Sequence, residues 1–331
     1  MAYGFFKGEK VLVTGGTGLI GGPLVERLVD QGAKVKIASL DNVSRAHPQA
    51  EFCRVNLTRF ERCIEVCRGM DYVFHLAGVK GSPAMTAKRP ATFFVPTILF
   101  NTNILEAARQ CEVKHVLYTS SYGVYAPAEI FREDDVWKTF PSPHDKFAGW
   151  AKRMGELQAE AYAIEYDWHH VSIVRPANVY GADDNFDAQN AMVIPSLIRR
   201  AMDGENPFVV WGDGSAVRDF VHARDVARGM LLAVEKEVSQ PINLGSGMGV
   251  SVRRLVEIII GQLDRKPEVV WDTTKPSGDR IRVMDVSRAK SVGWVPSVSI
   301  EEGIRETMKW YRENRSVADE RFNVFREQKP V

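Results

Sequence analysis

The chain has 331 residues, of which 45% are hydrophobic and 10% aromatic, enough to bury a large core in one large domain or in two domains. Its 43 basic and 42 acidic residues leave a net charge of +1, which argues against a broad nucleic-acid or membrane surface but not against a local phosphate pocket. Four cysteines in a chain of this length predict no disulfide framework, and Cys63 and Cys67, with no histidine nearby, predict packing thiols rather than a metal site.

The beginning of the chain leads almost directly into a predicted strand and contains no cleavable signal segment. The most apolar run, residues 91–100, is interrupted by Pro96 and is too short to span a bilayer. We therefore expect a soluble, cytoplasmic protein with no metal site, no nucleic-acid partner and no membrane contact.

Short apolar runs alternate with helical patterns up to about residue 175. The predicted strands are rich in β-branched residues and cover residues 10–16, 33–40, 71–78, 114–121 and 169–181. Helical patterns lie between them, over residues 19–32 and 96–111. This alternation predicts an α/β fold with a doubly wound parallel sheet of the Rossmann type. Ligands of such sheets bind beyond the carboxyl ends of the strands.

After Gly181 the pattern changes to loops, short strands and helices, which predicts a smaller substrate lobe interleaved with the sheet domain. We assign residues 1–178 and 214–243 to the dinucleotide-binding domain and residues 179–213 and 244–318 to a nucleotide-sugar-binding lobe. Residues 319–331 are predicted to be a weakly ordered tail.

The stretch VLVTGGTGLIGG, residues 11–22, places Gly15, Gly18 and Gly21 between a predicted strand and a predicted helix. Glycines at this spacing let the backbone approach a pyrophosphate, and the amides around Leu19 and Ile20 then face its charge. Although many glycine-rich turns are only structural, a strand before this one and a helix after it favour dinucleotide binding.

The end of the second predicted strand bears on which dinucleotide is bound. Asp41 would bind the ribose and oppose a 2′-phosphate, whereas Ser39 with Arg45 nearby would tolerate one. We favour NAD and leave NADP open. Asn56, in the stretch VNLT before the predicted strand at residues 71–78, is either an adenine contact or a turn residue. Three apolar residues complete the expected cofactor site: Leu57 in the same stretch, and Leu76 and Ala77 at the end of the strand at residues 71–78.

Two further stretches carry the chemistry: TSSYGVY, residues 119–125, and HDKFAGWAKRMGELQAEAY, residues 144–162. With the glycine-rich turn they resemble the extended short-chain dehydrogenase/reductase family, the NAD-dependent epimerase/dehydratases, over nearly the whole chain. Members of this family modify nucleotide sugars by hydride transfer at a ring carbon. Long matches to its GDP-fucose synthases cover residues 77–82, 174–200, 209–226 and 275–294.

The resemblance implies a catalytic serine, a tyrosine and a lysine, and the lysine also binds the nicotinamide ribose. Ser121 and Lys152 match the serine and the lysine, but the tyrosine position holds Ala148, whose methyl group moves no proton. The synthase cysteine and histidine that act in 3,5-epimerisation correspond here to Gly123 and Met192, so this inversion is not expected.

Seven nearby residues are candidates for the missing proton transfer: Lys152, Ser121, Tyr122, Tyr125, His144, Asp145 and Lys146. Our hypothesis is that Ser121, supported by Lys152 or a water, carries the proton in a slow reaction. The alternative is a lineage, or an engineered variant, that binds ligand with little turnover.

The resemblance also implies substrate contacts. Asn178 would touch the sugar diphosphate, and Arg218 and Arg282 would bind its phosphates, unless they are surface arginines in salt bridges. Trp211 is either a nucleobase contact or a core residue, and Lys80 either faces the sugar or is a solvated loop lysine.

The leading hypothesis is a nucleotide-sugar oxidoreductase that acts at C4, with a GDP-sugar as the preferred substrate. A 4-epimerase or 4,6-dehydratase ranks lower, and a nucleotide-binding relative with little catalysis is the non-enzyme alternative. By analogy with the family we expect a homodimer through the helices at residues 101–110 and 151–162. The apolar face of the second helix would otherwise pack on its own sheet.

Overall fold

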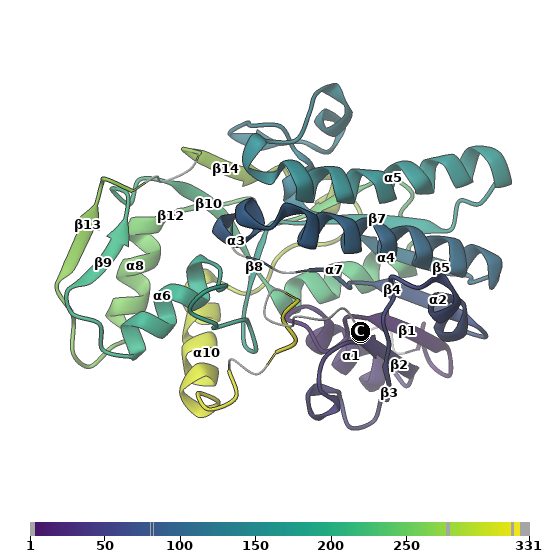
Figure 1. Cartoon of the computed structure of the whole chain (residues 1–331), viewed down its shortest axis with the longest axis horizontal. Coiled ribbons are helices and arrows are strands. Elements are labelled where there is room, and N and C mark those ends of the chain that lie inside the picture. Colours follow the sequence, from purple (N-terminus) through teal and green to yellow (C-terminus); the bar gives the residue numbers. More distant parts are fainter. Residues whose placement is uncertain (1–3, 80, 82, 276–278, 319–320, 325–331) are drawn as a thin grey trace.

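The computed structural model describes residues 4–79, 81, 83–275, 279–318 and 321–324. A wide sheet domain lies beside a smaller lobe (Figure 1). The seven parallel strands of the main sheet follow the order β11 (Ile242–Leu244), β7 (Val171–Pro176), β5 (His115–Thr119), β4 (Tyr72–His75), β1 (Lys10–Thr14), β2 (Lys34–Ser39) and β3 (Glu51–Arg54). The chain reverses its direction of winding between β1 and β4, where doubly wound sheets bind ligands. The predicted fold class is confirmed.

Helices cover both faces of this sheet because successive side chains of a strand point to opposite faces. Val11 and Val13 of β1 join the apolar cluster of α1 (Gly21–Asp30) and α7 (Ala223–Glu235). Leu12, between them, joins the opposite cluster. That second cluster also takes in residues of α2 (Phe60–Cys67), α4 (Pro90–Gln110) and α5 (Lys146–Tyr166).

Helix α4 begins six residues before the predicted start at Pro96 and continues through that proline. The expectation that Pro96 interrupts this run was therefore wrong. A proline removes one backbone hydrogen bond from a helix, but α4 packs against α2 and α5 in the second apolar cluster. In the described part of the chain, no helix has both the length and the apolar character needed to cross a membrane.

The lobe has its own apolar cluster. The other strands of the chain form the sheets of the lobe: β8 (Asn178–Tyr180), β9 (Phe208–Trp211), β10 (Val217–His222), β12 (Gly249–Ser251), β13 (Val269–Asp272) and β14 (Ile281–Met284). A short strand that comes earlier in the sequence, β6 (Ile130–Phe131), pairs with β14. The remaining helices are α3 (Pro83–Lys88), α6 (Val193–Met202), α8 (Val252–Gly261), α9 (Ser287–Ser291) and α10 (Ile300–Glu313). After α10 the chain returns from the lobe toward the sheet domain (Figure 1), where Phe322 contacts Asp41.

Candidate active site

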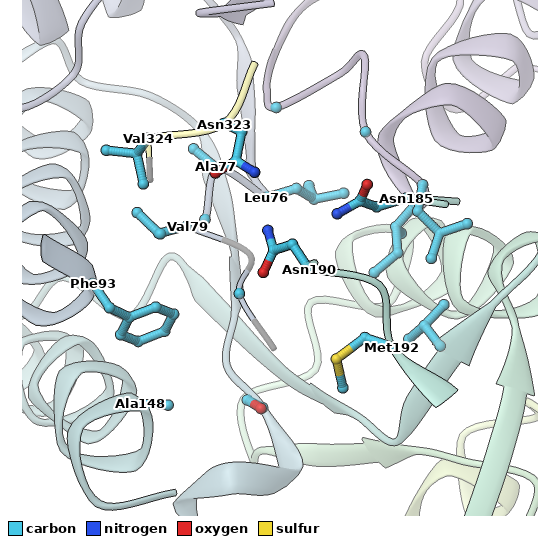
Figure 2. Close-up of a pocket in the computed structure, with 18 of the residues that line it drawn as sticks. Leu76, Ala77, Val79, Phe93, Ala148, Asn185, Asn190, Met192, Asn323 and Val324 are labelled. Atoms are coloured by element: carbon cyan, nitrogen blue, oxygen red, sulfur yellow. The ribbon is translucent and has the colours of Figure 1, made fainter. Parts of the chain in front are cut away.

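A cavity of about 1050 Å³ lies along the carboxyl ends of the parallel strands and continues between the sheet domain and the lobe. Gly15 and Ser39 line its cofactor end, Ser121 and Ala148 line its middle, and Asn178 borders the lobe. In Figure 2, Leu76 and Ala77 lie across from Asn185 and Asn190, and Ala148 and Phe93 lie on the helical side. Apart from Lys152, the predicted cofactor residues therefore share one space with the predicted catalytic serine.

The glycine loop is closed tightly. Gly15 has a φ of +69°, which favours glycine, and an added Cβ would lie 3.1 Å from the Cα of Ala77. An added Cβ on Gly21 would lie 2.2 Å from the carbonyl oxygen of Gly15. No side chain caps the start of α1, and its first turn has no acidic residue. This geometry fits the pyrophosphate of a dinucleotide at the positive end of the helix dipole.

A buried histidine holds the neighbouring strand ends in place. The Oγ1 of Thr14 accepts hydrogen bonds from the backbone N–H groups of Leu76 and Ala77, both at 3.1 Å. It therefore donates its own proton to Nδ1 of His75, 2.8 Å away, which leaves Nε2–H of His75 to bind Asn101 at 2.9 Å. Burial lowers the pKa of His75 to about 3, so the ring stays neutral and the wall formed by Leu76 and Ala77 is kept in register.

The end of β2 carries the polar group expected for a ribose. The hydroxyl of Thr17 lies 2.9 Å from Oγ of Ser39 and 3.0 Å from Oδ2 of Asp41. Arg45 lies near Asp41, with 3.9 Å between Nε and Oδ2, and it also forms an ion pair with Asp183. Thr17, which lines the cavity, was not predicted from the sequence, although it lies inside the glycine stretch.

Asn56 lines the cavity and also makes a turn. Its Oδ1 accepts hydrogen bonds from the backbone N–H and the hydroxyl of Thr58, at 3.0 and 2.9 Å. The turn interpretation is therefore confirmed. An adenine contact stays a prediction, as it does for Leu57, which also lines the cavity.

Ser121 and Ala148 meet at the catalytic corner of the cavity. Ser121 precedes a short 3-10 helix (Tyr122–Val124), and its Oγ accepts a hydrogen bond from the N–H of Gly123 at 3.1 Å. One helical turn after Ala148, Lys152 places its Nζ 5.3 Å from the centroid of the Tyr118 ring. Burial lowers the pKa of Lys152 to about 8. Lys152 is not among the residues that line the cavity.

The structure separates the candidates for the missing proton transfer. Tyr125 is 2% exposed, donates its hydroxyl to Oδ1 of Asn243 at 2.6 Å and accepts from Arg175 at 3.1 Å, so it belongs to the core. Lys146 does not line the cavity either. Tyr122, His144 and Asp145 line it together with Ser121.

The two predicted phosphate-binding arginines lie side by side. Arg218 of β10 and Arg282 of β14 are register partners in a parallel pair, far apart in sequence. Arg282 is 11% exposed at its side chain and binds Oδ2 of Asp145 at 2.8 Å, with Asp279 as a second anion. Neither arginine lines the cavity, but Asp145 does, so Arg282 is connected to the cavity through this carboxylate. Arg282 thus forms salt bridges but is not a surface residue, and its role as a phosphate contact stays a prediction.

The other predicted substrate residues have separate positions. Asn178 lines the cavity and donates its amide to the carbonyl oxygen of Asp219 at 2.9 Å. Trp211, at the end of β9, is 61% exposed and does not line the cavity, so the core interpretation was wrong. Lys80 lies outside the described residues.

Several lining residues were missed in the sequence. Asn185, Asp187 and Asn190 come from the loop between β8 and α6, where a dense run of Asp and Asn was the available signal. Residues 321–324 also line the cavity, although they belong to the segment predicted to be a weakly ordered tail. No local pattern in that segment indicated this position.

The strand order, the glycine loop and the shared cavity define a dinucleotide-binding α/β enzyme. Comparison with known proteins then gives the family: residues 11–245 match the NAD dependent epimerase/dehydratase family, and the chain belongs to it. The protein is therefore an enzyme that uses a nicotinamide dinucleotide.

Its relatives have several names. The chain is 31% identical to a protein named putative GDP-L-fucose synthase 2 of Arabidopsis thaliana, over 93% of each chain. It is also 31% identical to a dTDP-4-dehydro-6-deoxy-D-allose reductase of Streptomyces sp, over 92% of this chain and 97% of the other. The UDP-glucose 4-epimerase of Thermotoga maritima, solved with UDP-glucose, matches with a TM-score of 0.80 at 29% identity, over 92% of this chain and 99% of that one.

Proposed function

We propose that the protein is a nucleotide-sugar oxidoreductase, with a GDP-sugar as its first candidate substrate, that transfers hydride between C4 of the sugar and the nicotinamide. The cavity carries this proposal, because one space of about 1050 Å³ connects the glycine loop with Ser121 and with the lobe. Such a space accommodates a dinucleotide and a second ligand together. NAD is the preferred cofactor because Asp41 lines the adenosine end.

Proton transfer at C4 is assigned to Ser121 and Lys152. When bound, the nicotinamide supplies or accepts the hydride. The Ser121 hydroxyl, which lines the cavity, binds the reacting sugar oxygen. At Ala148 a methyl group replaces a phenol, which leaves room for a water between that oxygen and the more deeply placed Lys152. With a pKa of about 8, Lys152 exchanges protons near neutral pH, the range in which general acids and bases are effective.

Inversion at C3 and C5 is not part of the proposal. Gly123 and Met192 both line the cavity at the positions assigned to the proton-transfer groups of that reaction. Neither residue has a side chain that can take up or release a proton. We therefore do not assign a 3,5-epimerisation to this cavity.

The diphosphate end is assigned to Arg218, Arg282 and Asn178. The two arginines lie beside each other on β10 and β14, and Asn178 lies on the adjacent strand β8. GDP is preferred because several curated relatives that match most of the chain are named GDP-L-fucose synthases. A diphosphate site of this kind accepts any nucleoside diphosphate, so the base must be tested.

The test measures the absorbance of the reduced nicotinamide while GDP-, UDP- and dTDP-linked sugars and their 4-keto forms are added to the full chain. We expect a substrate-dependent change with a GDP-sugar and a rate about a hundredfold lower in Ser121→Ala. Tyr122→Phe is the matched control, since it removes the neighbouring hydroxyl from the cavity. No change with any sugar would contradict the proposal, and a sugar inverted at C4 without net change of cofactor would assign a 4-epimerase.

We also propose a homodimer through α4 and α5. Leu157 and Ile164 of α5 are 44% and 79% exposed and lie two helical turns apart, so this apolar face is not used up by packing on the chain's own sheet. Ile164→Lys should shift the mass measured by light scattering from a dimer to a monomer. An unchanged mass, or a monomeric wild type, would contradict the dimer.

A further inference from the structure

The segment after α10 reaches the adenosine end of the cavity. The backbone N–H of Phe322 donates to Oδ1 of Asp41 at 2.7 Å, while the hydroxyl of Thr17 donates to Oδ2 of Asp41 at 3.0 Å. Residues 321–324 line the cavity together with Asp41. Figure 2 draws Asn323 and Val324 among the residues that line the cavity. The carboxylate expected to bind the ribose thus contacts a residue 281 positions away in sequence.

One aspartate, Asp183, binds residues 321–324 and also an arginine of the sheet domain. Arg321 forms an ion pair with Oδ2 of Asp183 at 2.9 Å and also donates to the carbonyl oxygen of Asp183. Arg45, from the sheet domain, pairs with the other carboxylate oxygen of Asp183. The side chains of Arg321 and Arg45 are 14% and 11% exposed, whereas the carboxylate side chain of Asp183 that they share is 37% exposed. Asp183 therefore joins the end of the chain, the lobe loop and the region after β2.

The cluster also affects the choice of dinucleotide. Arg45 is the cation that follows Ser39 and could otherwise bind a 2′-phosphate. Here its guanidinium is held by Asp183 and lies near Asp41. A 2′-phosphate at the ribose would meet the carboxylate of Asp41, with Arg45 already neutralised by another anion. The arrangement favours a dinucleotide without that phosphate.

We propose that residues 321–324 are a strap that completes the dinucleotide site, retains the bound cofactor and, through Asp183 and Arg45, selects NAD over NADP. The strap spans the boundary between the sheet domain, through Asp41, and the lobe, through Asp183. Release of the cofactor then requires these contacts to open. The inference rests on the nicotinamide cofactor of the family and not on the identity of the sugar.

Release of the reduced cofactor tests the strap in the full chain. Protein loaded with NADH is mixed with excess NAD, and the loss of reduced-nicotinamide fluorescence gives the release rate. We expect Arg321→Ala to release NADH about tenfold faster, since it removes charge-assisted bonds to Asp183. Arg315→Ala is the matched control, because Arg315 is 55% exposed and pairs with Asp203. Its release rate should stay within about twofold of wild type.

Selectivity is the second readout. Asp183→Asn should release Arg45 and shift the ratio of NADPH to NADH affinity about tenfold toward NADPH. Hydrogen exchange at the Phe322 amide, measured with and without NADH, should slow when the cofactor is bound. If the wild type retains NADH and Arg321→Ala releases NADH within about twofold of the wild-type rate, the strap is wrong and the cofactor site is unaffected. A wild type that binds neither dinucleotide overturns the cofactor site, and the strap with it.

Discussion

The cofactor end and the catalytic end of the cavity differ in how completely they match the residues expected for the family. At the cofactor end the glycines, the start of α1 and Asp41 are all present; Gly15 has a positive φ, and Gly21 packs so closely that an added methyl group would collide with backbone. At the catalytic corner we propose that Ser121 and Lys152 act without the usual acid/base group, at whose expected position the chain has Ala148. Cofactor binding depends on many backbone positions, whereas proton transfer depends on a single side chain.

This contrast explains how the chain keeps a complete dinucleotide site beside an altered reaction centre. Substituting one loop glycine disturbs the packing of the whole turn. Substituting one tyrosine leaves α5 and the cavity walls in place, because an alanine suits a helix well. The following changes test the two ends in turn.

The largest effect is expected at the corner. Ala148→Tyr restores a phenol on a wall of the cavity, one helical turn before Lys152, and should raise the rate of hydride transfer about a hundredfold. The measurement is the initial rate of absorbance change with the best nucleotide sugar. Phe147→Tyr places the same hydroxyl one residue away and should give no gain. An equal gain in both variants would contradict the assignment of position 148.

The second-largest effect is expected at the cofactor end of the cavity. In Gly21→Ala the new methyl group would lie 2.2 Å from the carbonyl oxygen of Gly15, so backbone must move. We expect a loss of about 3 kcal/mol in the free energy of unfolding, and weaker NADH binding. Gly22→Ala is the control, since nothing lies within 4 Å of its added Cβ. Chemical denaturation that shows equal stability for both variants would argue against the tightly closed loop.

The pH dependence tests Lys152, whose pKa burial lowers from 10.5 to about 8. As the proton donor in ketone reduction, Lys152 is charged below pH 8, so kcat should be flat there and fall about tenfold per pH unit above it. Oxidation should show the opposite slope. Lys152→Met should remove the inflection, and an inflection that persists in this variant would assign it to another group.

The lowered pKa of Lys152 also predicts how the free energy of unfolding changes with pH. Between pH 8 and pH 10.5 the unfolded chain keeps the Lys152 proton that the folded chain has released. Because the unfolded state binds more protons there, this group makes stability rise with pH across that window. Denaturant titrations of wild type and Lys152→Met at pH 8 and pH 10 check the difference.

A smaller effect is expected at the diphosphate end. Arg282→Ala should raise KM for the nucleotide sugar about tenfold with little change in kcat, because it removes a cation from beside the cavity. Arg280→Ala is the matched control, since Arg280 is 78% exposed and pairs with Glu129. If both substitutions change KM equally, the assignment of Arg282 is wrong.

The smallest effect belongs to Trp211. It is 61% exposed and lies outside the cavity lining, so Trp211→Ala should leave KM within about twofold. Binding titrations with GDP check this. A rise of KM by tenfold would restore the nucleobase contact that the sequence suggested.

Local patterns in the sequence were sufficient for the elements and for the cofactor loop. The glycine spacing between Gly15 and Gly21, the apolar strands, and the one-turn separation of Ala148 from Lys152 are all short-range features. A strand or helix imposes its period on neighbouring residues, so such features can be recognised from the sequence alone. The same patterns placed Ser121 at a strand end and therefore in the cavity.

Only the tertiary structure decided which distant residues meet. The parallel pairing of β10 with β14 sets Arg218 beside Arg282, and the return of the chain after α10 sets Phe322 on Asp41 and Arg321 on Asp183. Helix α4 continues through Pro96, where local preference alone predicts a break. These features depend on packing and charge pairing between segments far apart in sequence, whose energies no local pattern records.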